Sequence, residues 1–306
     1  MMTITPEARE VLDKSRAMVS YAANFEDVIL ARLFRGQESG FYVDVGAHDP
    51  LGNSNTRHFY ERGWRGINIE PASTFHVFPI QRPRDINLQL AVSDHCGQAT
   101  FVECSELPAV SQLSDDLRPP AAAGSLPCQA VTVATRTLAS IFEQYAPPCI
   151  DFMSLDVEGH ERQALSGNDW ARFRPRVLVI EATLPFSNTL CHHDWEGIVL
   201  QAGYLFGYFD GINRFYVRED EKDMLQRLAA PVNVLDNFVS HRTAALERRT
   251  RNLMAQLERL RAAQRAALNE GALDGIGRRS LRLGLWLARR LTQLGGLWQR
   301  ARGARS

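Results

Sequence analysis

Long apolar segments are missing from this sequence of 306 residues. No run of about 18 consecutive apolar residues occurs, and this excludes a conventional membrane-spanning helix. The first 16 residues, MMTITPEAREVLDKSR, contain no apolar core. We therefore expect no signal peptide, and the two absences together favour a cytoplasmic protein.

Closely spaced cysteine pairs are also missing. The five cysteines are odd in number and include no CxxC pair; they are Cys96, Cys104, Cys128, Cys149 and Cys191. This spacing indicates neither a zinc site nor a disulfide framework. The pattern is typical of a protein that works in a reducing compartment.

Lysine is almost absent, and the basic residues are unevenly distributed. Only Lys14 and Lys222 are lysines, so nearly all positive charge comes from arginine. Residues 240–306 contain 15 arginines and four acidic residues, whereas residues 1–239 contain 20 basic and 31 acidic residues. An acidic body followed by a basic tail indicates two parts with different partners. We divide the chain into a body at 1–239, a helix at 240–270 and a tail at 271–306.

Short apolar segments alternate with helical patterns along the body. We expect strands at 41–46, 64–70, 85–92, 99–103, 129–136 (an edge strand), 150–156, 176–182, 204–209 and 213–218. We expect helices within 7–35, from 54 or 55 to 62, and at 71–80, 138–145, 161–165 and 195–202. Residues 105–127 have the composition of a long loop. This order predicts an α/β fold with a mostly parallel sheet and a C-terminal antiparallel hairpin around Asp210 and Gly211.

The turn after the first predicted strand lacks the GxGxxG pattern of a dinucleotide site. It offers Gly46 and His48, with Asp44 and Asp49 on either side, where a pyrophosphate needs bare amides. Further polar residues follow the other strands: Glu70, Ser93, Asp94, Asp156, Glu158 and Glu181. In an open parallel sheet these strand ends meet at one crevice. Acidic side chains there favour a cationic ligand, S-adenosylmethionine, over NAD.

Five motifs in order resemble the FkbM-type methyltransferases, a branch of the class I S-adenosylmethionine-dependent enzymes. They are FYVDVGAHDP (41–50), NSNT (53–56), GWRGINIEP (63–71), LAVSD (90–94) and LDVEGHE (155–161). The resemblance covers about residues 18–240 and implies a Rossmann-like fold. It implies that Asp44, Gly46, Glu70 and Asp94 bind the cofactor, with His48 and Ser93 beside them. Family members mostly methylate hydroxyl groups of sugars, polysaccharides or secondary metabolites.

The acceptor hydroxyl needs a base, and three residues after the 150–156 strand are candidates. Asp156, Glu158 and His160 lie within reach of one another in sequence, and each is able to accept a proton. Asp156 and Glu181 end neighbouring strands, so they are alternatively ligands for a divalent cation such as Mg²⁺. Simpler roles also remain open. Asp156 and Glu158 are placed to cap the following helix, and His48 is placed to shape its loop.

The residues after 239 have a different character. Leu246, Leu253, Leu257 and Leu260 form a short coiled-coil seam, which suggests a homo-oligomer through 240–267. Residues 271–306 form a basic amphipathic segment suited to a membrane surface or a partner protein. No nucleic-acid-binding motif accompanies the charge, so we expect no nucleic-acid partner.

These patterns predict an S-adenosylmethionine-dependent O-methyltransferase acting on a hydroxyl of a sugar, glycan or glycolipid. Docking through the tail would place it at the inner membrane face. A soluble secondary metabolite is an alternative acceptor. A non-catalytic scaffold for glycan assembly is an alternative function.

Overall fold

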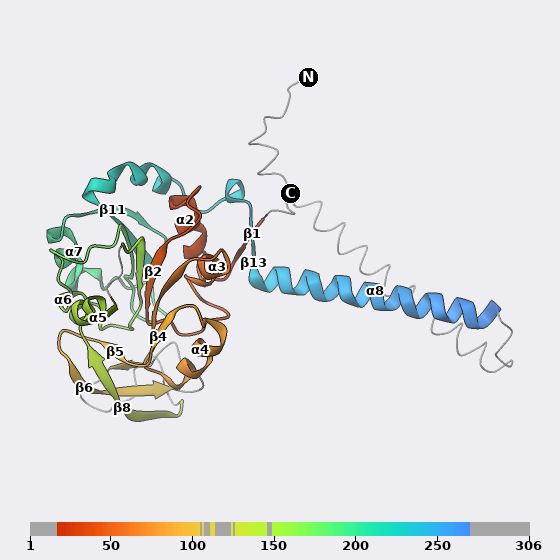
Figure 1. The fold of residues 1–306 in the computed structure, drawn as a ribbon, viewed down its shortest axis with the longest axis horizontal. Helices are drawn as coiled ribbons and strands as arrows, with labels where there is room; N and C mark the ends of the chain where they lie inside the picture. The colour runs from red at the N-terminus through yellow and green to blue at the C-terminus, as the bar shows by residue number, and fades with distance from the viewer. Residues whose placement is uncertain are drawn as a thin grey trace, which may run out of the picture. The chain divides into compact units, whose positions relative to one another are not determined.

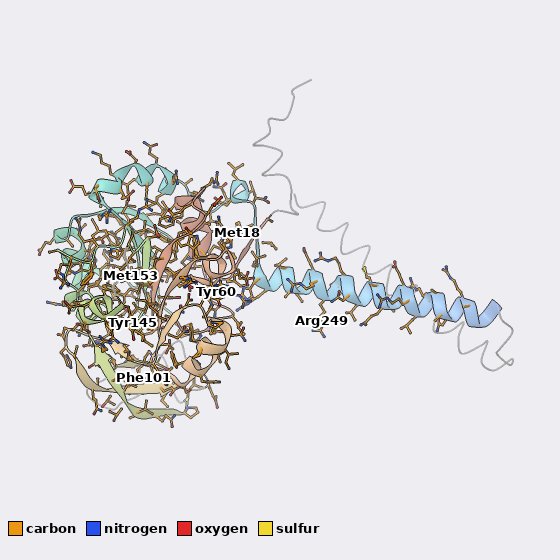
Figure 2. All side chains as sticks on the ribbon, viewed as in Figure 1. Met18, Tyr60, Phe101, Tyr145, Met153 and Arg249 are labelled. Carbon is orange, nitrogen blue, oxygen red and sulfur yellow. A yellow bond between two sulfur atoms is a disulfide. The ribbon has the colours of Figure 1, made fainter. Side chains whose placement is uncertain are left out.

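The computed structural model describes residues 17–104, 106, 111–113, 124, 126–145 and 149–269 (Figures 1 and 2). The described residues up to His241 form one compact unit, and those from Arg242 onward belong to a second. In the second unit the structure describes the helix α8 (His241–Asn269). The predicted tail at 271–306 lies outside the described residues, as does most of the predicted loop at 105–127.

A seven-stranded sheet forms the centre of the body. The strands stand in the order β11-β12-β10-β9-β2-β3-β4. β10, β9, β2, β3 and β4 pair in parallel, whereas β12 runs antiparallel to both β10 and β11. Their bounds are β2 Phe41–Val45, β3 Arg65–Ile69, β4 Ile86–Leu88, β9 Phe152–Leu155, β10 Val177–Glu181, β11 Tyr204–Phe209 and β12 Asn213–Arg218. The prediction of a mixed α/β fold is confirmed.

Helices cover both faces of this sheet, which explains why its central strands are apolar throughout. α2 (Glu26–Leu33) and α3 (Arg57–Glu61) pack on one face through Ile29, Leu30 and Phe59. α5 (Leu138–Tyr145), α6 (Glu161–Ser166) and α7 (Glu196–Gln201) pack on the other through a separate apolar cluster. Figure 1 shows the two helical layers on opposite sides of β2.

A second sheet of four strands, in the order β5-β8-β6-β7, joins the main sheet through the segment after β4. The strands are β5 Ala91–Val92, β6 Gly97–Cys104, β7 Gln112–Leu113 and β8 Cys128–Arg136. The predicted single strand at 85–92 is therefore wrong. Residues 86–88 form β4 and pair with β3, whereas Ala91 and Val92 form β5 and pair with β8. The predicted edge position of 129–136 is also wrong, since β8 lies between β5 and β6.

One disulfide corrects the expectation drawn from the cysteine spacing. Cys104 and Cys128 face each other in register at the ends of β6 and β8, and their sulfur atoms are bonded. The two cysteines are 24 residues apart, so no local motif reveals them. Strand pairing, not sequence proximity, brings the thiols together. Cys96, Cys149 and Cys191 are free.

The N-terminal part of the body is less helical than predicted. Residues Met18–Ser20 form β1, which pairs in parallel with β13 (Phe238–Ser240), and a helix begins only at Glu26. Glu26 and Asp27 are buried and bonded to neighbouring polar groups. Residues 1–16 lie outside the described part.

The remaining elements are short. The predicted helix at 71–80 is a 3-10 turn, η2 (Ser73–Val77), followed by α4 (Phe78–Gln81). Three more 3-10 helices follow: η5 His192–Asp194, η6 Glu219–Leu228 and η7 Val234–Asp236. None of the helices in the described ranges combines the length and apolar character needed to cross a membrane.

Candidate active site

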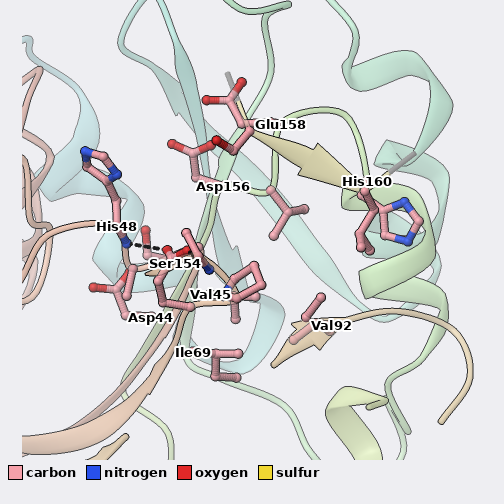
Figure 3. Close-up of a pocket in the computed structure, with 18 of the residues that line it drawn as sticks. Asp44, Val45, His48, Ile69, Val92, Ser154, Asp156, Glu158 and His160 are labelled. Atoms are coloured by element: carbon pink, nitrogen blue, oxygen red, sulfur yellow. Dashed lines mark hydrogen bonds between the residues drawn. The ribbon is translucent and has the colours of Figure 1, made fainter. Parts of the chain in front are cut away.

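A pocket opens at the carboxyl ends of β2, β3 and β9 (Figure 3). This is the edge at which an open parallel sheet binds its ligands. Its polar wall includes Asp44, His48, Glu70, Asp156 and Glu158, and its apolar floor includes Val45, Ile69, Leu90, Val92, Phe101 and Leu113. Phe101 and Leu113 come from the second sheet, and Phe101 was not among the residues expected at the site.

Gly46 allows the end of β2 to contact the backbone that follows β9. Its φ is +78°, and a Cβ atom there would lie 1.6 Å from the backbone oxygen of Asp156. The backbone N–H groups of Gly46 and Ala47 both donate to the oxygen of Ile69. The glycine therefore permits close approach of the Asp156 loop, and these two amides are not directed at a ligand.

Glu70 holds the turn after β2. One carboxylate oxygen accepts from the His48 backbone N–H at 2.7 Å, and the other accepts from Ala72 N–H at 2.8 Å. Burial raises the pKa of this carboxyl, and the two amide donors oppose that rise. A carboxylate oxygen has two lone pairs, so each retains one acceptor position toward the pocket.

Asp44 lines the pocket and is largely buried. Its carboxylate accepts from the Thr56 hydroxyl at 2.7 Å, and burial raises its pKa to about 6. Asn55, from the same loop as Thr56, donates to the Ser154 hydroxyl on β9 at 2.9 Å. The NSNT segment therefore ties β2 and β9 together and places Asn53 and Asn55 in the pocket lining.

Three carboxylates gather where β9 and β10 end, and two of them, Asp156 and Glu158, line the pocket. Asp156, Glu158 and Glu181 each have an oxygen within 4.8 Å of an oxygen of the other two. Figure 3 shows the Asp156 and Glu158 carboxylates side by side. Burial raises the pKa of all three, and for Glu158 and Glu181 the neighbouring carboxylates raise it further. Carboxylates this close to one another favour the protonated form of at least one of them.

Glu158 extends the pair expected from the sequence to a triad. Its backbone adopts a left-handed conformation with φ of +52°, and its Oε2 atom is buried without a hydrogen-bond partner in the structure. Glu161, at the start of α6, accepts from the Val157 and Gly159 N–H groups and so shapes this loop.

His160, Ser93 and Asp94 lie to one side of the carboxylates. His160 Nε2 is 3.2 Å from the Ser93 hydroxyl, and Figure 3 shows its ring apart from Asp156 and Glu158. The Asp94 side chain is 51% exposed and pairs with His95 at 2.7 Å. Ser93 and Asp94 are not among the residues that line the pocket. The structure thus brings together the other cofactor candidates and leaves these two outside.

The chemistry of the pocket is that of a mixed site. An apolar floor suits a flat aromatic ring, while a wall of carboxylates suits hydroxyl donors and positive charge. The arrangement therefore fits a ligand with both features, and the carboxylate triad is placed to take a proton from a hydroxyl at the opening.

Comparison with known families assigns the body. The sequence model described as the methyltransferase FkbM domain matches residues 44–206, just over half of the chain. The matched segment begins at Asp44 on β2, contains the whole pocket wall and ends in β11. No curated protein matches the chain. The resemblance read from the five motifs is confirmed, and the chain belongs to the FkbM methyltransferase family.

Proposed function

We propose that this protein is an S-adenosylmethionine-dependent O-methyltransferase. The observation that carries the proposal is the convergence of Asp44, Glu70 and Asp156 at three neighbouring strand ends, around one apolar floor. The strand order, with an antiparallel pair beyond β10, supports the choice of a class I methyltransferase. Family membership supports methyl transfer, and the pocket supports the choice of donor.

The residues present fit this cofactor. Glu70 keeps acceptor positions free for ribose hydroxyls, and Ile69, Leu90, Val92 and Phe101 offer an apolar slot for the adenine ring. Asp44 and Asp156 supply negative charge for the ammonium and sulfonium groups, and His48 closes the turn beside them. Asp94 is the weakest candidate, because its exposed side chain bonds to His95.

S-adenosylmethionine supplies an electrophilic methyl group when bound. The protein must place the acceptor oxygen in line with that methyl and remove its proton. We assign the proton of the acceptor hydroxyl to the carboxylate triad, with Asp156 as the accepting group beside Glu158 and Glu181. The deprotonated acceptor oxygen would then be able to take the methyl group that a bound S-adenosylmethionine would supply. His160 remains a candidate base, although its ring is turned toward Ser93.

A divalent cation is an alternative occupant of the triad. Three carboxylates with oxygens within 4.8 Å match the oxygen ligands that Mg²⁺ prefers. Such an ion would lower the pKa of an acceptor hydroxyl and orient it. Equilibrium dialysis with Mg²⁺, comparing the wild type with Glu181→Gln, separates this alternative from a shared proton.

The acceptor in this proposal is a hydroxyl of a sugar, glycan or glycolipid, with a soluble secondary metabolite as the second candidate. Transfer of labelled methyl groups to a panel of neutral glycans and glycosides tests it. An Asp156→Asn variant that kept full activity would remove the proposed base. If the protein bound no S-adenosylmethionine, the scaffold alternative would replace the enzyme.

The functions expected of residues after 239 remain predictions. Self-association through 240–267 is tested by sedimentation of the full chain against a Leu253→Ser, Leu260→Ser variant. Docking of 271–306 on a membrane surface or a partner protein is tested by vesicle flotation after deletion of that segment.

A further inference from the structure

Four exposed apolar side chains lie beside the carboxylate triad. Most large apolar side chains exposed on the described part of the body are scattered singly, as is usual for a protein surface. Leu184, Phe186, Leu190 and Ile212 instead come from two adjoining segments and are 40–72% exposed. We call these four residues the apolar rim.

Backbone hydrogen bonds place the rim next to the triad. Glu181 ends β10, and two residues later the chain enters a short loop closed by a bridge between Thr183 and Leu190. Ala182 N–H donates to the oxygen of Ile212, at 2.9 Å. Leu184 therefore lies three residues beyond Glu181, and Ile212 is hydrogen-bonded to Ala182, the residue next to Glu181.

The loop that carries three of the four residues is well braced. Leu184 N–H donates to the oxygen of Thr189, Cys191 N–H donates to the oxygen of Ala182, and the Ser187 hydroxyl donates to that of Thr189. Phe186 sits at the tip with φ of +52° and is 72% exposed. Phe186 is therefore exposed at the tip of a hydrogen-bonded loop.

The charge beside the rim limits what it binds. Several acidic residues lie at this end of the sheet, among them the triad and Asp210, and Asp210 lies in the same turn as Ile212. An anionic lipid surface would be repelled here, because membrane-surface segments rely on basic residues beside the apolar ones. A neutral molecule meets no such penalty.

We propose that the apolar rim binds an alkyl or aryl group of an uncharged acceptor whose hydroxyl lies at the carboxylate triad. The acceptor is then an amphipathic molecule, such as a neutral glycoside with an apolar aglycone. This inference rests on the proposed methyl transfer for its orientation, but binding to the rim is measurable without it.

Photolabelling of the full chain with trifluoromethyl phenyldiazirine, a neutral apolar probe, tests the rim directly. The label should concentrate on peptides that contain residues 184–190 and 212. Octyl β-glucoside, below its micelle concentration, should reduce that labelling about fivefold, whereas methyl β-glucoside should not, because only the octyl chain has apolar area to bury. Equal labelling of Val234, which is 86% exposed in η7, would overturn the proposal.

Variants then locate the binding surface. Phe186→Ser should reduce labelling of the rim and weaken octyl β-glucoside competition about fivefold, while the matched Val234→Ser leaves both unchanged. Thermal unfolding of both variants checks their folding. If Phe186→Ser instead abolished flotation on phosphatidylcholine vesicles or converted a dimer to a monomer, the occupant would be a bilayer or a second copy, and the proposal would be wrong.

Calorimetry with S-adenosylmethionine separates this proposal from the proposed function. If the protein bound the cofactor but octyl β-glucoside did not reduce labelling of the rim, only the acceptor subsite would be wrong. If octyl β-glucoside reduced labelling of the rim but the protein did not bind S-adenosylmethionine, the methyltransferase proposal would be wrong and the rim would still be an apolar binding site.

Discussion

Gly46 and Asp156 come into direct backbone contact, so that a Cβ atom on Gly46 would lie 1.6 Å from the Asp156 carbonyl oxygen. The contact joins the end of β2 to the loop that carries the proposed base. Position 46 therefore tolerates only glycine, both for its φ of +78° and for lack of space.

Replacing Gly46 with alanine should destabilise the body severely. The clash is with backbone, so neither side can yield cheaply, and we expect a loss of roughly 3–5 kcal/mol in the free energy of unfolding. Gly63→Ala is the matched control, because Gly63 has a φ of +94° and no atom within 4 Å of the added carbon. Its cost should be about 1 kcal/mol. Equal urea-unfolding midpoints for the two variants would contradict the contact.

Much of this architecture was predictable from local patterns. β2, β3, β9 and β10 are mostly apolar strands with glycine or an acidic residue at their carboxyl ends, and the carboxyl ends of β2, β3 and β9 do meet at one pocket. Asp44, Gly46, Glu70 and Asp156 were found in this way. The signal is local, because burial on both faces of a parallel strand demands apolar residues at consecutive positions.

The features that were missed depend on pairing between distant segments. Residues 85–92 read as one strand, and only the pairing of Ala91 with Thr135 on β8 reveals the break. The Cys104–Cys128 bond and the contribution of Phe101 to the pocket depend on the same second sheet. Asp94 bonds to His95 and does not line the pocket, and its proposed contact with the cofactor stays a prediction.

The disulfide should stabilise the second sheet measurably. Closing a loop of this length limits the unfolded chain and contributes about 3 kcal/mol by chain entropy. Dithiothreitol should therefore lower the unfolding midpoint of the wild type. It should have no effect on a Cys104→Ala, Cys128→Ala variant, which starts from the lower value. A wild type indifferent to reductant, with no free-thiol difference by mass spectrometry, would show that the bond does not form.

Stability should fall with rising pH through Glu26. This carboxyl accepts from Asn213 and from the Asn24 amide in a buried position, and burial raises its pKa to about 8. The folded state thus binds the proton more tightly than the unfolded state. Its contribution is complete below the unfolded pKa and is lost as the pH rises through about 8, at no more than about 1.4 kcal/mol per pH unit.

Glu26→Gln tests this linkage. The variant should lose some stability at pH 5, because the NH₂ group of the introduced glutamine would face an N–H donor of Asn24 or Asn213 where Glu26 accepts a hydrogen bond. Its stability should depend less on pH between 5 and 8. Chemical unfolding at four pH values gives the two slopes. Parallel slopes would mean that Glu26 titrates normally in the folded protein.

Cofactor affinity should rise with pH near neutrality. Burial raises the pKa of Asp44 to about 6 and also raises that of Glu70, so both carboxyls are partly neutral in mild acid. A cationic sulfonium ligand favours their ionised forms. Between pH 5 and 7 the affinity for S-adenosylmethionine should therefore increase more steeply than the affinity for S-adenosylhomocysteine, whose sulfur is a neutral thioether. Identical pH profiles for the two ligands would remove the electrostatic role of this wall.

Titration calorimetry of S-adenosylmethionine into the full chain tests the central claim most directly. We predict saturable binding at one site per chain and competition by S-adenosylhomocysteine. A Glu70→Ala variant that is shown to be folded should bind at least tenfold more weakly. The reason is that losing a pair of charged hydrogen bonds costs at least about 1.5 kcal/mol. Absence of binding by the folded wild-type protein, or binding unchanged in Glu70→Ala, would contradict the assignment of this pocket.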